Sequence, residues 1–185
     1  MKRALCLLVV VFLLSACGKN AALDRAMQLR SALLQGTGCS FDAEITADYG
    51  DKTYSFVMRC QTDTAGALVF SVIAPESISG VTGTVDEIGG KLKFDEKALA
   101  FPNLIEGLIT PVAAPWLLMH SMTGGYMKAC RETEDGIHLI IDDSYRENTV
   151  QVELYCDKDN NPIRGEILWE GRRIVALDVT NFVIQ

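Results

Sequence analysis

The chain has few of the residues and motifs on which most enzyme mechanisms depend. It contains only two histidines, His120 and His138, and no G-x-S-x-G, S-x-x-K or H-E-x-x-H segment. A hydrolase needs a positioned base beside its nucleophile, and no such pair is visible. His138 alternates with apolar neighbours, so we expect it to point to the wetter face of a strand and both histidines to be structural or surface residues. The sequence therefore predicts a protein that is not an enzyme and has no cofactor.

Spacings typical of metal sites are also missing. No two cysteines are spaced as C-x-x-C, which leaves little support for a zinc site or a thioredoxin-like redox pair. The acidic segment 157–161 is similar to half of a calcium loop, but it lacks the central Gly and the closing Glu, so we interpret it as a hairpin turn. Asp42, Glu44 and Asp48 alternate with apolar residues and are expected on a solvated face. We predict no metal.

Long apolar runs and excess positive charge are absent too. After Cys17 no stretch reaches the roughly 20 apolar residues of a membrane-spanning helix. The formal net charge is −7 at pH 7, which makes nucleic acid or an anionic lipid surface a poor partner.

The N-terminus carries the one distinctive signal. Lys2 and Arg3 precede the apolar run 4–16, which has the length of the central region of a signal peptide. The run ends in Leu-Ser-Ala-Cys at Cys17, which resembles the lipobox of bacterial lipoproteins. In that family the Cys receives a diacylglycerol and becomes the first residue after cleavage. The alternative is an ordinary secretory signal that happens to contain a Cys.

The lipobox resemblance implies a division of the chain. We expect a signal peptide at 1–16, a lipid anchor on Cys17, a short tether at 17–20 and a single domain at 21–185. The protein would be extracytoplasmic and held to a bacterial membrane by its lipid alone, since two or three acyl chains on one residue anchor stably. An outer-membrane location stays possible.

Four cysteines remain after Cys17, an even number that suits disulfides in an exported domain. A two-residue hairpin loop at Tyr49-Gly50 would place Cys39 opposite Cys60, within disulfide range, whereas a register shifted by two residues would make the pair diagonal. Cys130–Cys156 then follows by elimination, although strands paired in chain order would place these two residues two strands apart.

Hydrophobic periodicity predicts an α+β domain. A helix is expected at 21–35, with Arg30 interrupting its apolar face; its stem should pack and its charge reach solvent. Strands are expected at 41–49, 54–60, 67–74, 80–88, 91–94 and 98–101, and a closing meander at 126–133, 137–141, 149–156, 163–169 and 173–183. Between these groups lies a helical region at 104–122, which Pro115 should shorten or kink.

Two stretches in this order of elements resemble the LolA/LppX-like family of exported lipoproteins. They are VFSVIAPESISGVTGTVDEIGGKLKFDEKALAF (69–101) and VELYCDKDNNPIRGEILWEGRRIVALDVTNF (152–182), and ITPVAAPWLLM (109–119) is similar to the helix that this family places across the mouth of its sheet. The resemblance covers most of residues 21–185 and is one of pattern, without a diagnostic motif. It implies a strongly curved antiparallel sheet, a half-barrel, with an N-terminal helix and a helical insert on its concave face.

The resemblance also implies a function, with two alternatives. The first is a non-enzymatic lipoprotein that binds a lipid or another acylated molecule between sheet and helices. The second is a protein-interaction module like the lipidated GerS proteins, with a filled core and a cell-envelope enzyme as partner. The family also implies an arginine that latches its lid, which the sequence alone does not assign. The residues expected to line a cavity, or else to fill the core, are Phe41, Ile45, Phe56, Met58, Phe70, Trp116, Met119 and Trp169.

Overall fold

The computed structural model describes residues 20–105, 108–143 and 150–185. The expected signal peptide at 1–16, and Cys17 with its lipid, lie outside the described residues, so these stay predictions. Within the described part, no helix has the length and apolar character needed to cross a membrane.

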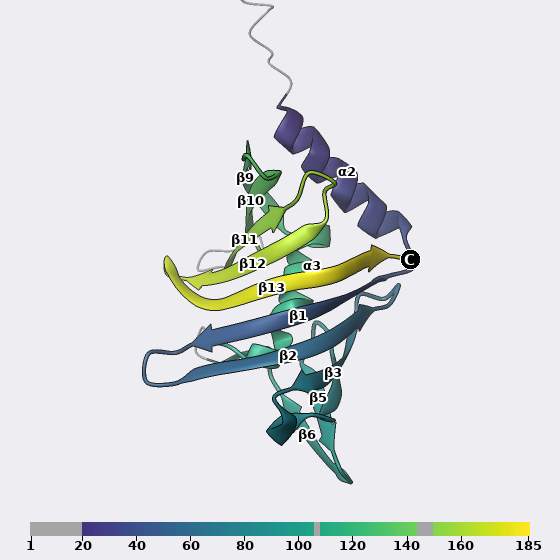
Figure 1. Ribbon diagram of the computed structural model, residues 1–185, viewed down its shortest axis with the longest axis vertical. Coiled ribbons are helices and arrows are strands. Elements are labelled where there is room, and N and C mark those ends of the chain that lie inside the picture. Colours follow the sequence, from purple (N-terminus) through teal and green to yellow (C-terminus); the bar gives the residue numbers. More distant parts are fainter. Residues whose placement is uncertain (1–19, 106–107, 144–149) are drawn as a thin grey trace, which may run out of the picture.

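Eleven strands form one open antiparallel sheet in the order β6-β5-β4-β3-β2-β1-β13-β12-β11-β10-β9 (Figure 1). Two meanders thus meet where the first strand pairs with the last. The strands are β1 (Cys39–Asp48), β2 (Thr53–Thr62), β3 (Leu68–Ala74), β4 (Thr82–Val85), β5 (Gly90–Phe94), β6 (Lys97–Phe101), β9 (Tyr126–Glu132), β10 (Ile137–Asp142), β11 (Gln151–Cys156), β12 (Pro162–Trp169) and β13 (Arg172–Ile184). The meander expected at the end of the chain is confirmed.

The N-terminal helix α2 (Ala21–Gln35) has the predicted bounds. Its first turn is capped by the side chain of Asn20, which accepts a hydrogen bond from the Leu23 amide at 3.2 Å. At the other end Gly36 is extended and its amide donates to the carbonyl of Ala32 at 3.0 Å. Local capping signals in the sequence are therefore enough to fix both ends.

The helical insert is shorter than predicted. Helix α3 (Ala114–Gly124) follows a single 3₁₀ turn at Pro111–Ala113, and Pro115 lies in its first turn, where the missing N–H costs nothing. The sequence predicted a helix that Pro115 would either shorten or kink, and a short helix is what forms. The expected helix was wrong at 104–105 and 108–109, because these residues form the two short strands β7 (Leu104–Ile105) and β8 (Leu108–Ile109). The residue before a proline avoids the helical region, and Thr110 is extended.

The core lies on the concave side of the curved sheet. Helix α3 crosses behind the middle of the sheet in Figure 1, and α2 packs along β9 and β10. One continuous apolar cluster joins both helices to the sheet, and its buried residues run from Ala22 to Val179. The predicted α+β class with a curved half-barrel sheet is therefore confirmed. Every described residue of this core lies within 20–185, so we expect that segment to fold without the residues before it.

The predicted register of the first hairpin was wrong by two residues. Cys60 lies opposite Phe41, and the turn has four residues because the Tyr49 amide donates to the Lys52 carbonyl at 3.0 Å. Cys39 and Cys60 share the concave face but are diagonal neighbours, so the argument for a bridge from direct opposition fails.

The second pair, Cys130 and Cys156, is separated by the intervening strand β10, as pairing in chain order implied. All four cysteines are free thiols in the structure. Both disulfides stay predictions without geometric support.

Candidate functional site

The residues predicted to line a cavity come together in the core. Phe41, Ile45, Met58 and Phe70 are at most 2% exposed. The same cluster includes Phe56, Trp116 and Met119, and the half-buried Trp169 packs against it at the end of β12. The concave face is therefore filled by side chains at these positions, and their role as ligand contacts stays a prediction.

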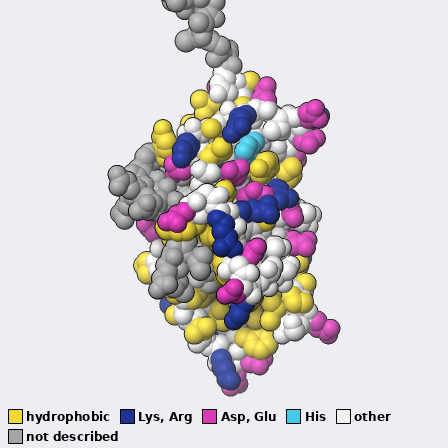
Figure 2. All heavy atoms as spheres, turned by 90° about the vertical axis from the view of Figure 1, so that its left-hand side faces the viewer, with side chains coloured by type: hydrophobic (Ala, Val, Ile, Leu, Met, Phe, Trp, Pro, Cys, Tyr) yellow, Lys and Arg dark blue, Asp and Glu magenta, His cyan; other side chains and the backbone are white. Residues whose placement is uncertain are grey.

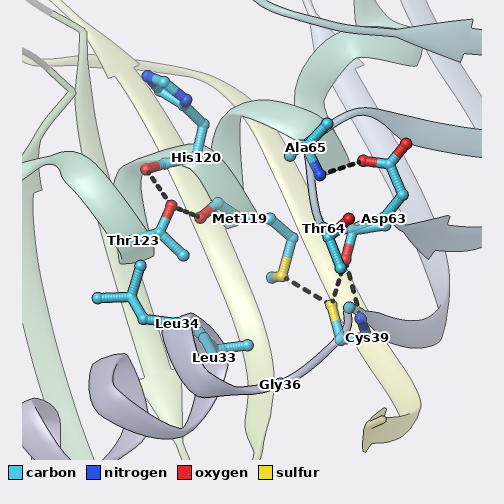
Figure 3. Close-up of a pocket in the computed structure, with 13 residues that line it drawn as sticks. Leu33, Leu34, Gly36, Cys39, Asp63, Thr64, Ala65, Met119, His120 and Thr123 are labelled. Atoms are coloured by element: carbon cyan, nitrogen blue, oxygen red, sulfur yellow. Dashed lines mark hydrogen bonds between the residues drawn. The ribbon is translucent and has the colours of Figure 1, made fainter.

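A pocket of about 290 Å³ opens beside this core, where three segments meet. They are the end of α2 with the loop that follows it, the turn between β2 and β3, and the outer side of α3 (Figure 3). Of the predicted lining residues only Met119 reaches it. The other residues around it are Leu33, Leu34, Gly36, Gly38, Cys39, Thr62, Asp63, Thr64, Ala65, Gly66, His120 and Thr123. We call it the α2–α3 pocket.

The α2–α3 pocket combines an apolar wall with a polar rim. Leu33, Leu34 and Met119 supply the apolar wall, and Leu34 is 64% exposed. The carboxylate of Asp63 is held in the β2–β3 turn, where it accepts from the amides of Ala65 and Ala67 at 2.9 and 3.0 Å. This arrangement fits a small amphiphile, with its apolar part inside and its polar end at the rim.

A buried thiol closes the inner end of the pocket. The Cys39 Sγ lies 3.3 Å from the Thr62 hydroxyl and 3.5 Å from the Met119 Sδ. Burial raises the pKa of the Cys39 thiol, and the hydrogen bond between Cys39 and Thr62 opposes this only in part. The thiolate, which is the nucleophilic form, is therefore disfavoured, and Cys39 contributes an apolar surface to the pocket.

Trp116 fixes the position of α3 against the pocket. Its indole Nε1 donates to the Gly66 carbonyl at 3.1 Å, and its ring stacks on that of His120 with centroids 4.7 Å apart. His120 was predicted to be structural, and this stacking agrees with that role. The spacing of four residues between Trp116 and His120 is the feature of the sequence that could have predicted contact between the two rings on one face of a helix.

Arg30 joins the two helices and was misread from the sequence. Its guanidinium does not reach out to solvent but donates to three carbonyls at the end of α3. The Nε–Met122 O distance is 2.6 Å, and Nη2 lies 2.9 Å from Gly125 O and 3.4 Å from Ser121 O. The last carbonyls of a helix lack partners within it, and the negative end of its dipole favours a cation. Since α3 has no basic residue in its own last turn, Arg30 supplies this cap from α2.

Replacing Arg30 with Met is expected to lower the free energy of unfolding by about 2–3 kcal/mol, because hydrogen bonds to a charged group are lost while the stem is kept. Urea unfolding of residues 20–185 measures this. Arg59→Met is the control: that side chain is 67% exposed and pairs with Asp42 on the surface, so its loss should cost about 1 kcal/mol or less. Equal losses in the two variants would contradict the capping role.

Two other candidate features are structural. His138 faces the convex side, where it contacts Glu153 at 2.9 Å and stacks on Tyr155. The segment 157–161 is the turn between β11 and β12, as predicted, and Arg25 donates to its Asn160 side chain at 2.8 Å. In the described ranges no cluster of three or more His, Cys, Asp or Glu residues could hold a metal.

No family model and no curated protein matches the sequence. Solved structures do match. A DUF1329 family protein from Desulfovibrio piger superposes with a TM-score of 0.50 at 8% identity, over 89% of this chain and 92% of the other. A putative outer membrane lipoprotein-sorting protein domain from Vibrio parahaemolyticus gives 0.49 at 10% identity, over 86% and 91%. A LolA superfamily protein from Nitrosomonas europaea gives 0.48 at 9% identity, over 89% and 93%.

At these identities the matches concern the fold alone. The architecture itself carries the conclusion: an open, curved antiparallel sheet of eleven strands, with α2 along one end of its concave side and α3 across its middle. This is the arrangement that the sequence resemblance implied. The chain therefore has the LolA/LppX-like fold.

Proposed function

We propose that this protein is a lipid-anchored, non-enzymatic binding protein of the bacterial cell envelope, and that its ligand is a single acyl chain or an amphiphile of similar size. The α2–α3 pocket is the observation that carries the proposal. Its volume of about 290 Å³ is just below the roughly 300–1,000 Å³ of ligand pockets. The ligand is therefore small, and a lipid with several acyl chains does not fit inside.

Leu34→Glu tests the pocket. Placing a carboxylate on the apolar wall should weaken binding of dodecanoic acid to residues 20–185 by at least about tenfold, because the apolar contact is lost and like charges approach. Leu34 is exposed, so the fold should be unaffected. Isothermal titration calorimetry gives the affinity.

Met27→Glu is the matched control, since Met27 is on the same helix, is 50% exposed and does not line the pocket. This variant should bind as the unaltered chain does. The proposal is wrong if the unaltered chain fails to bind the fatty acid, or if both variants bind it equally well.

A second candidate is a protein-interaction module, and the filled core favours it. The residues between the sheet and α3 leave a large lipid little room, since most of them are almost fully buried. Lipid extraction and mass spectrometry of the purified protein separate the two candidates. A reproducible co-purified acyl compound supports the first, and a ligand-free protein that also rejects dodecanoic acid supports the second.

A further inference from the structure

The two edges of the sheet are protected differently. At one edge α2 packs against β9, and the pairing of β9 with β10 is broken by an irregularity between Ile140 and Ile141. At the other edge β6 pairs with β5 through five regular pairs, and no described strand pairs with its outer side. A regular edge presents unpaired N–H and C=O groups that can accept another strand.

The concave side of this edge is apolar and partly uncovered. Phe70, Gly83, Leu92 and Leu99 lie opposite one another across β3 to β6, so they share the face on which Phe70 enters the core. Burial falls along this row, from 2% exposure at Phe70 to 61% at Leu99.

On the same face, Phe101 of β6 is half-buried and Phe94 of β5 is 44% exposed. Figure 2 shows hydrophobic side chains at the lower end of the molecule, where these strands lie. The apolar core therefore continues into solvent at β6.

A single unpaired cation marks one end of the edge. Lys97 lies opposite Phe94 and so shares the concave face with Leu99, whereas Lys91 and Lys93 alternate with Leu92 onto the convex face. Among the described residues Lys97 has no ion-pair partner, although the chain as a whole is acidic. A carboxylate opposite Lys97 on an added strand would supply the missing ion-pair partner.

We propose that the outer edge of β6 docks an extended segment of a partner protein. The segment adds as an antiparallel strand with apolar residues opposite Phe101 and Leu99, small or polar residues opposite Ala100 and Ala98, and an acidic residue opposite Lys97. Main-chain hydrogen bonds give such strand addition its affinity, and alternate side chains give its specificity. The site is separate from the α2–α3 pocket and does not depend on it.

A second copy of this chain is the poorer occupant. Two β6 strands paired antiparallel over all five residues place Leu99 opposite Leu99 and Lys97 opposite Phe101, which offers no carboxylate to either lysine. A segment of another protein with the pattern apolar-x-apolar-x-acidic places apolar residues opposite Phe101 and Leu99 and a carboxylate opposite Lys97.

The peptide acetyl-Ser-Val-Thr-Val-Thr-Glu-Ser-amide is a direct probe. It should bind residues 20–185 saturably, and NMR shift changes should be confined to β5 and β6. Three control peptides separate backbone pairing from charge. Two of them are methylated on alternate backbone nitrogens, one on the odd and one on the even positions, and at least one of these two should lose binding. In the third, Lys replaces Glu, which should weaken binding about fivefold.

Variants of the protein locate the contacts. Lys97→Glu should weaken the Glu peptide about fivefold and restore the Lys peptide, while Lys93→Glu, on the convex face of the neighbouring strand, should change neither. Leu99→Asp should weaken both peptides more than about tenfold.

Four outcomes would overturn the proposal. They are no saturable binding up to about 1 mM peptide, undiminished binding of both methylated peptides, no effect of Leu99→Asp, and concentration-dependent dimerisation that Leu99→Asp removes. The last would make a second copy the occupant. Dodecanoic acid binding measured in the same variants should be unchanged, so failure of this proposal is distinguishable from failure of the pocket.

Discussion

Leu118→Ala is expected to lower the free energy of unfolding by about 4 kcal/mol. Leu118 is fully buried at the centre of α3. It sits over Gly165, where a Cβ would lie only 2.8 Å from the leucine Cδ1, and Gly165 is flanked on its own face by Leu154 and Leu177. The leucine thus fills a depression in the sheet that the helix cannot close by moving, because α3 is held elsewhere by Trp116.

The same substitution distinguishes a filled core from a hollow one. If the space between α3 and the sheet were a preformed ligand cavity, the truncated side chain would already face empty space and its loss would cost much less. Chemical denaturation of residues 20–185 gives the value. Leu23→Ala, on an exposed position of α2, is the control and should cost about 0.5 kcal/mol or less. A cost for Leu118→Ala near that of the control would show that the middle of the domain is not packed.

A double-mutant cycle confirms the contact itself. Gly165→Val alone should be destabilising by about 1–3 kcal/mol, since its side chain overlaps Leu118. In the Leu118→Ala background the added valine fills the space instead, so the combined loss should be smaller than the sum of the two single losses. Additive losses would mean that the two positions do not touch.

The parts of the fold that depend on local pattern could be predicted from the sequence. Asn20 and Gly36 mark the ends of α2, and the alternation along β1 and β2 assigns their faces correctly. Register is different, since a shift of two residues leaves every side chain on the same face. Alternation therefore could not reveal the four-residue turn at Tyr49–Lys52, and the disulfide derived from the shorter turn lost its basis.

The α2–α3 pocket could not be predicted, because it exists only where three distant segments meet. In the sequence Leu34 is one more apolar residue of the helix at 21–35, and residues 62–66 carry no motif that marks a binding site. Arg30 was noticed as an interruption of an apolar face, but its partners are backbone carbonyls about ninety residues away, which leave no trace in side-chain pattern. The face to which a strand residue points follows from local alternation, whereas the rim of a pocket formed by three distant segments does not.

Cys17→Ala is expected to shift the protein completely from the membrane fraction to the soluble extracytoplasmic fraction. Two or three acyl chains on one residue bind a bilayer stably, and removing the thiol that carries them removes this attachment. Cys6→Ala is the matched control and should stay in the membrane fraction, because Cys6 is expected to leave with the signal peptide. Fractionation and the intact mass of the purified protein are the measurements.

The mass keeps this test decisive if the altered precursor is not cleaved and stays bound through its apolar run. The unaltered protein should have the mass of residues 17–185 plus the lipid, and Cys17→Ala should lack the lipid whatever its location. An unmodified Cys17 in the unaltered protein would refute the anchor, but not the pocket or the β6 edge, which depend only on residues 20–185.

The anchor would also orient the two proposed sites. Asn20 is three positions after Cys17, a reach of about 10 Å at full extension, so the start of α2 would lie close to the membrane. Figure 1 places β6 at the opposite end of the molecule from the start of α2. The edge of β6 would then face away from the membrane toward proteins of the envelope, where an incoming strand meets no lipid. Cys17→Ala should therefore leave peptide binding at β6 unchanged, although the protein is no longer held at a membrane.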